Sequence, residues 1–275
     1  MVSTGTMVAM GFTLILSAVV PLAAMLVYSI MRKKQGVVAA WFLGAAGFFV
    51  TQVIIRIPLL SLCSLSEGFV AFAENNYVIY SILLAFTAAL FELVGRYVGA
   101  KILSKNLTFT KGFAAGLGHG GIEAMVIVGM TYITNFMYAA MINSGTIDTI
   151  IAEVEAAGVD ATSIHQLVDS LVNTPSIIFC LAGYERLLTM ICHLAMTLIV
   201  FYYVAQKQDL KGIGICLIFH TILDSVCGIV NGMTTPYIGS FLTQNASYVI
   251  LYTFLTVVAV ASIFIIRKIA KAWKN

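Results

Sequence analysis

Residues 78–100 read VIYSILLAFTAALFELVGRYVGA, and this stretch decides the fold class of the chain. Its only charged residues are Glu92 and Arg96, and a helix of this length crosses the hydrocarbon core of a bilayer. Six further apolar runs of comparable length accompany it. Together they predict an all-α polytopic membrane protein with seven spans, at residues 8–31, 37–60, 78–100, 112–134, 177–205, 212–230 and 246–266.

The composition of the whole chain agrees with this reading. Of its 275 residues, 60% are hydrophobic and only 10% are charged, and the mean hydropathy is +0.99. Soluble domains carry about 25% charged residues, so a water-soluble enzyme, a disordered tail and a nucleic-acid-binding protein are excluded. Seven spans and one modest loop fill the chain, which predicts a single integral membrane domain over residues 1–275 with no nucleic-acid partner.

The basic residues predict the orientation of the spans. Twelve of the 15 lysines and arginines fall on one side if the N-terminus is outside: Arg32, Lys33, Lys34, Lys101, Lys105, Lys111, Lys207, Lys211, Arg267, Lys268, Lys271 and Lys274. The opposite loops are acidic, with Arg186 as their one basic residue. The positive-inside rule therefore predicts an N-out, C-in protein of the plasma membrane. Arg56, near the outer end of span two, is expected to snorkel.

The largest loop, residues 143–176, has helical periodicity. Apolar residues recur at helical spacing from Ile147 to Val154 and again from Ile164 to Val172, with Gly158 between the two sets. Thr162 or Ser163 is the expected N-cap of the second set. The loop is therefore expected to form two short amphipathic helices on the outer membrane surface, either as a simple surface hairpin or as a lid over a site.

Seven ionisable residues lie inside the predicted spans, and they define the candidate site. A charged residue at the centre of a spanning helix costs about 2.5–3.5 kcal/mol on the insertion scale, so such residues mark function. Counted from the nearest basic marker at 1.5 Å per residue, all of these groups except Arg96 lie about 12–21 Å above the cytoplasmic edge. They form one layer from four helices: Glu92, Arg96, His119, Glu123, His193, His220 and Asp224.

Spacing within the helices supports a built site. Glu92 and Arg96, His119 and Glu123, and His220 and Asp224 are each four residues apart, so each pair lies on one helix face. The sequence GLGHGG at residues 116–121 would also let a neighbouring backbone approach His119 closely.

Imidazoles and carboxylates in one polar layer suit two tasks. One is hydrolysis, in which a carboxylate accepts a proton from water while imidazoles bind a metal ion or donate to the oxyanion. The other is transport or permeation of a metal ion or proton through a coordination site. A scaffold without catalytic function is a third reading. The sequence contains no HExxH or GxSxG, and its spans hold one aspartate, so zincin, serine-hydrolase and aspartyl-dyad sites are absent.

At this point the ordered motifs resemble a known family. FExxxR at residues 91–96, GxGHGGxE at 116–123, Glu185-Arg186 leading to His193, and HxxxD at 220–224 are similar to those of the YhfC family of bacterial membrane proteins. That family is grouped with the CAAX-protease and bacteriocin-processing family and with PrsW as intramembrane proteases. The resemblance extends from about residue 10 to residue 266.

The resemblance implies an intramembrane endopeptidase that cleaves a membrane-anchored peptide or protein. Glu92 would act as the general base on water, with His119, His193 and His220 as oxyanion donors or metal ligands. Arg96, Glu123 and Asp224 would orient them. Both a glutamic-type mechanism and a metal-dependent one, with zinc as the expected ion, remain open at this stage.

Overall fold

The computed structural model describes residues 1–273; Lys274, one of the twelve basic residues assigned to the inner side, lies outside them. The described residues contain helices and no β-strand. Seven helical stretches are long and apolar enough to span a membrane: Thr4–Met31, Val37–Cys63, Tyr77–Ile102, Phe109–Ser144, Ser176–Ala205, Asp209–Gly232 and Gln244–Ala272. Each predicted span lies within one of them, which confirms the all-α, seven-span fold class.

The residue contacts divide the chain into two compact units, Met1–Leu22 with Ala124–Leu187 and Ala23–Glu123 with Leu188–Asn275. The first unit holds the π-helices η1 (Ile15–Val19) and η4 (Ala124–Gly129) and the helices α1 (Thr4–Leu14), α8 (Met130–Ser144), α9 (Thr146–Ala156) and α10 (Thr162–Asn173). It also holds the start of α11 (Ser176–Ala205). The single membrane domain expected from the sequence stays a prediction.

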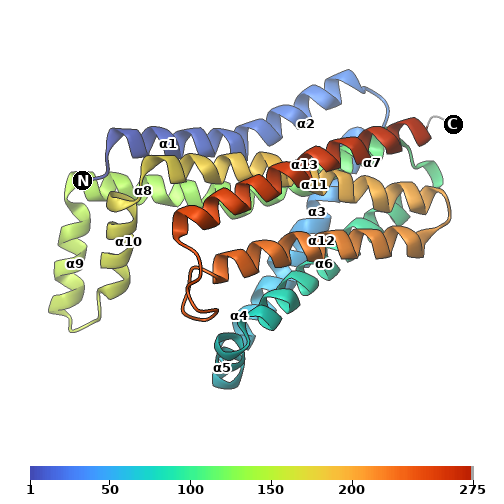
Figure 1. The fold of residues 1–275 in the computed structure, drawn as a ribbon. Helices are drawn as coiled ribbons and strands as arrows, with labels where there is room; N and C mark the ends of the chain where they lie inside the picture. The colour runs from blue at the N-terminus through green and yellow to red at the C-terminus, as the bar shows by residue number, and fades with distance from the viewer. Residues whose placement is uncertain (274–275) are drawn as a thin grey trace. The chain divides into compact units, whose positions relative to one another are not determined.

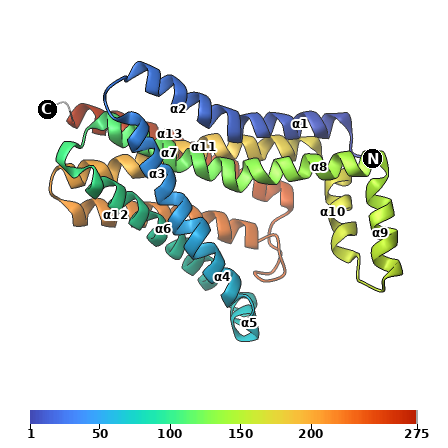
Figure 2. The ribbon, with the colours of Figure 1, turned by 180° about the vertical axis from the view of Figure 1, so that it is seen from behind.

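In the first unit α1 lies along α8 (Figures 1 and 2). Met10, Tyr132 and Phe179 are buried between the helices. Thr13 donates a hydrogen bond to the Phe179 carbonyl at 2.5 Å and accepts one from the Gly183 amide at 3.1 Å. Polar side chains thus join α1 to α11 where apolar packing alone gives little specificity in a bilayer.

The loop over residues 143–176 forms the two predicted helices, α9 and α10, which run side by side as a hairpin (Figures 1 and 2). The predicted cap is wrong. Ala161 occupies the N-cap position of α10, and Asp160 accepts hydrogen bonds from the Thr162 amide at 2.9 Å and the Thr162 hydroxyl at 2.6 Å. These bonds lower the pKa of the Asp160 carboxyl.

The second unit contains the helices that carry the polar layer. Its segments are α2 (Val20–Met31), α3 (Val37–Phe48), η2 (Phe49–Arg56), α4 (Ile57–Cys63), α5 (Glu67–Asn75), α6 (Tyr77–Ile102), η3 (Ser104–Asn106), α7 (Phe109–Glu123), α12 (Asp209–Gly232) and α13 (Gln244–Ala272), with the rest of α11. Helix α3 contacts both α6 and α7, and α12 packs along α6 (Figures 1 and 2).

Two π-helical segments, η1 and η2, have a common cause. The first ends two residues before Pro21 and the second two residues before Pro58. Proline cannot donate to the carbonyl four residues earlier and its ring crowds that carbonyl, so the preceding turn widens. Accordingly, the Ile57 amide donates to the Gln52 carbonyl, five residues back. Pro58 therefore sets the rotation of Gln52 and Arg56 relative to α3.

Glycines let α3 and α7 touch through their backbones. A Cβ atom built on Gly118 would lie 2.0 Å from the Trp41 carbonyl oxygen, and one on Gly44 would lie 1.9 Å from that of Ala115. On another face of α7, a Cβ on Gly116 would lie 3.0 Å from the Leu194 Cα of α11. The close approach predicted around His119 is therefore confirmed, and it brings α7 against both α3 and α11.

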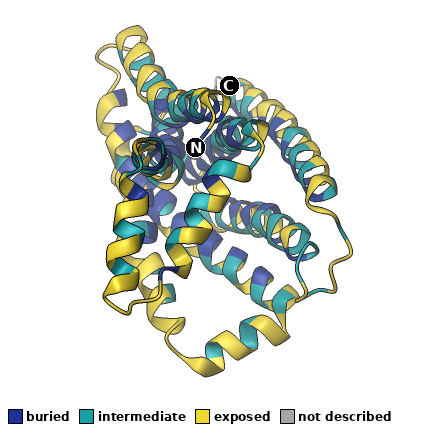
Figure 3. Ribbon diagram, turned by 90° about the vertical axis from the view of Figure 1, so that its left-hand side faces the viewer, coloured by how far each residue is buried: buried dark blue, intermediate teal, exposed yellow. Residues whose placement is uncertain are grey.

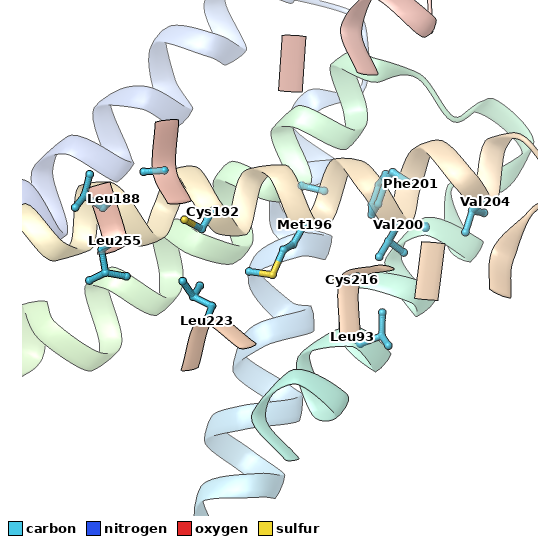
Figure 4. Packing of buried hydrophobic residues seen from close by; sticks show 13 residues of the cluster. Leu93, Leu188, Cys192, Met196, Val200, Phe201, Val204, Cys216, Leu223 and Leu255 are labelled. Carbon is cyan, nitrogen blue, oxygen red and sulfur yellow. The ribbon is translucent and has the colours of Figure 1, made fainter. Parts of the chain in front are cut away.

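An apolar cluster supports the polar layer within this unit. Leu93, Cys192 and Leu223 belong to it, and each is the sequence neighbour of an ionisable residue of the layer. Figure 4 shows Cys192, Met196 and Val200 along α11, with Leu223 and Cys216 of α12 and Leu93 of α6 nearby. The outer faces of the helices carry exposed residues, many of them apolar, as expected for surfaces solvated by lipid (Figure 3).

The contact between α3 and α7 predicts a large effect of one methyl group. Gly118→Ala forces the two helices apart, because the added Cβ meets a backbone oxygen that no side-chain rotation can move. We expect a loss of about 3 kcal/mol of stability, the upper end of the usual cost of overpacking, measured as a lower melting temperature in detergent. Gly214→Ala on α12 is the matched control, since nothing lies within 4 Å of its Cβ. Equal melting temperatures for the two variants would contradict this packing.

Orientation in the membrane stays a prediction from the positive-inside rule, and reporter fusions test it. A reporter active only in the cytoplasm should fluoresce when fused after Trp273 and stay dark when inserted at Gly158 between α9 and α10. A reporter active only outside should give the opposite pattern. Reversed signals at both positions would assign the N-terminus to the cytoplasm.

Candidate functional site

A buried ion pair on α6 forms the centre of the site. Glu92 and Arg96 lie one helical turn apart, and Arg96 Nη2 donates to Glu92 Oε2 at 2.9 Å. The two residues are only 4% and 2% exposed. Charges removed from water to this extent persist only with close partners, so the surroundings of Glu92 define what the site can do.

Three imidazoles from three other helices converge on Glu92 Oε2. His119 Nε2 of α7 lies at 3.0 Å, His193 Nδ1 of α11 at 3.5 Å and His220 Nδ1 of α12 at 3.7 Å. The His119 and His193 rings are stacked with centroids 5.5 Å apart, and the His220 ring stands perpendicular to that of His193. The common layer predicted from residue counts is thus a compact cluster.

His193 links the ion pair to Glu123. Its Nδ1 lies 2.6 Å from Arg96 Nη2, and its Nε2 lies 2.9 Å from Glu123 Oε2. A guanidinium has no acceptor, so Arg96 is the donor in its contact with Nδ1, and Nε2 is the nitrogen that faces the Glu123 carboxylate. Arg96 therefore contacts His193 as well as neutralising Glu92.

His220 and Asp224 form the more exposed end of the site. His220 Nε2 lies 3.2 Å from Asp224 Oδ2, one turn further along α12. The Asp224 side chain is 36% exposed, whereas that of His220 is 2% exposed. The pair therefore runs from the buried centre toward the surface of the unit. His220 Nδ1 faces Glu92 and makes no hydrogen bond with the described residues.

Two residues of the site were missed by the sequence analysis. Gln52 Nε2 of η2 donates to Glu92 Oε1 at 2.8 Å, and Arg56 Nη1 donates to Gln52 Oε1 at 3.2 Å. Arg56 does not snorkel as predicted, because its other nitrogens donate to Leu84 and Thr87 of α6. Gln52 escaped notice because the search covered ionisable groups. A polar amide four residues before an intramembrane arginine was the available signal.

The arrangement includes a group suited to a metal ion. One ligand atom from each of Glu92, His119, Glu123 and His193 lies within 4.8 Å of the others. Imidazole and carboxylate are the side chains of catalytic zinc sites in enzymes that hydrolyse peptide bonds. The chemistry of the donor set therefore fits a divalent metal ion.

All seven residues of the predicted layer lie in the second unit, and the contacts above connect every one of them. Glu185 and Arg186, quoted with the motifs, form an ion pair with each other on α11. The structure thus brings together the seven residues of the predicted layer and adds Gln52 and Arg56 of η2.

Comparison with known proteins agrees with this cluster. A family model described as YhfC intramembrane metalloprotease matches residues 16–243, a range that contains every residue of the site. A relative from Bacillus subtilis (strain 168), named uncharacterized membrane protein YhfC, is 29% identical over 184 residues, which cover 65% of this chain and 68% of the relative. No solved structure matches the chain. The chain belongs to the YhfC intramembrane metalloprotease family.

Proposed function

We propose that this multi-pass protein of the bacterial plasma membrane hydrolyses a peptide bond of a membrane-anchored peptide or protein, using zinc held by the buried cluster. One observation carries the proposal: two imidazoles and two carboxylates from α6, α7 and α11 converge within 4.8 Å in an apolar helical unit. Membership of a metalloprotease family supports it.

The ligand set we propose is His119, His193 and Glu123. Two histidines and one glutamate form a ligand set found in catalytic zinc sites of peptidases. The sequence analysis placed His220 third, but the ligand group includes Glu123 and lacks His220. When bound, the ion acts as a Lewis acid toward water and the peptide carbonyl.

Glu92 is then available as the proton acceptor. Gln52 donates to Glu92 Oε1, whereas Oε2, which also accepts a hydrogen bond from Arg96, is the oxygen nearest the histidines, so we assign Oε2 as the atom that takes the proton from the attacking water. The water oxygen bonds to the peptide carbon, the carbon–nitrogen bond breaks, and Glu92 returns the proton to the leaving amine. Arg96 stabilises the carboxylate form that accepts the proton.

His220 suits the oxyanion of the tetrahedral intermediate. Its Nε2 contacts Asp224, and its Nδ1 points toward the centre of the cluster. With both nitrogens protonated, Nε2 donates to Asp224 and Nδ1 donates to the developing negative charge. Asp224 stabilises that charged imidazole and orients its ring.

Removing the proposed base should abolish cleavage. In cells that express the wild-type protein, mass spectrometry of protein N-termini should detect new termini within or beside the spans of membrane proteins. Glu92→Gln should eliminate them, since an amide cannot accept the proton, while the variant still inserts in the membrane. Glu67→Gln changes an exposed glutamate of α5 and should leave them unchanged. Persistence of the same termini with Glu92→Gln would refute the proposed role.

Metal content tests the ligand set separately. The wild-type protein, purified in detergent, should contain about one zinc ion per chain by elemental mass spectrometry. His119→Ala and His193→Ala should each reduce that content at least about 10-fold. His165→Asn, in the exposed ion pair of His165 with Glu155, is the control and should retain zinc. Equimolar zinc in both alanine variants would place the ion elsewhere.

A further inference from the structure

We propose that Gln52, held in one orientation by Arg56, is a positioning residue that leaves Glu92 Oε2 as the reactive oxygen. The inference rests on the role of Glu92 proposed above. Gln52 and Arg56 lie in η2, which precedes the first of the sequence motifs quoted above. Neither residue belongs to any of those motifs.

The partners of the Gln52 amide allow only one orientation. Arg56 can only donate, so the atom facing it must be the amide oxygen. The Ala88 carbonyl and Glu92 Oε1 can only accept, so the atom facing them must be the amide nitrogen, at 3.2 Å and 2.8 Å. Both requirements agree, and a flipped amide would place two acceptors against each other on the Glu92 side.

Arg56 is itself fixed on α6. Its Nη2 donates to the Leu84 carbonyl at 2.7 Å and its Nε to the Thr87 hydroxyl at 3.2 Å. Arg56 of η2 therefore donates both to α6 and to Gln52, and Gln52 in turn donates back to α6 at Glu92. Such a closed path holds the carboxylate plane of Glu92 without using the oxygen that faces the histidines.

The wide turn of η2 makes this path possible. Thr51 and Gln52 are buried whereas Ile54 and Ile55 are exposed, so the segment directs its polar side toward α6 and its apolar side outward. Helix widenings of this kind are frequent at functional sites. A purely structural turn would not require a buried, doubly donating amide against the central carboxylate.

An infrared experiment tests the contact independently of cleavage and of metal. The band of the Glu92 carboxylate is obtained by subtracting the spectrum of Glu92→Gln from that of the wild type. In the Gln52→Met background, which keeps the side-chain volume but removes the amide, the corresponding difference band should shift. In the Thr51→Val background it should not, because the Thr51 hydroxyl bonds only within its own helix, to the Gly47 carbonyl.

Arg56→Met should produce a shift of the same sign, and the double variant of Gln52 and Arg56 should shift the band no further, since both act through one hydrogen bond. If Gln52→Met does not yield folded protein, Arg56→Met tests the same chain. An unshifted Glu92 band in the folded variant or variants would overturn the proposal.

The functional consequence is read from the new N-termini described above. Gln52→Met should reduce them about 10- to 100-fold at unchanged zinc content, as expected when a reacting group is misplaced by up to 1 Å. A shifted band with wild-type cleavage would overturn the positioning role. If the wild-type protein produces no new termini, the proposed protease function fails, and the infrared bands still decide whether Gln52 orients Glu92.

Discussion

One carboxylate in a low-dielectric interior constrains the rest of the second unit. Glu92 is 4% exposed, and an ionised group so buried is tolerated only when charges and donors surround it. Arg96, Gln52 and three imidazoles meet that requirement, and they come from α6, η2, α7, α11 and α12. Each of these five segments therefore has to lie where one of its side chains can contact the Glu92 carboxyl group.

Direct backbone contact between helices brings these side chains within reach of one another. Gly118 of α7 meets the Trp41 carbonyl of α3, and Gly95 of α6 meets Gly47 of α3. His119 follows Gly118 directly and Arg96 follows Gly95 directly, so two close interhelical approaches lie beside residues that carry the chemistry. In lipid, where apolar burial between helices gives little driving force, small residues and buried hydrogen bonds together hold the helices in place.

The sequence predicted the spans and the seven ionisable residues that cluster around Glu92 because both follow from local rules. Hydropathy identifies a span without knowledge of its neighbours, and an intramembrane charge such as Glu92 stands out against an apolar background. Gln52 did not stand out, because a neutral amide costs less in a helix and its role depends on meeting a residue 40 positions away. Arg56 was expected to snorkel because its partners, the Leu84 carbonyl and the Thr87 hydroxyl of α6, are also distant in sequence. The ligand group was also beyond reach, because which side chains of the layer bring their ligand atoms within 4.8 Å of one another depends on how the helices pack.

The π-helical turn of η2 has a consequence for how this span tolerates change over evolution. A π turn corresponds to one extra residue accommodated in an α-helix, and Pro58 keeps it in place. Loss of one residue between Phe49 and Arg56 would return the span to ordinary winding and change the phase of the side chains in this turn relative to α6. Substitutions on the lipid-facing side, such as at Ile54, preserve that phase. The number of residues in this turn, more than its hydrophobicity, therefore decides which of its side chains face α6.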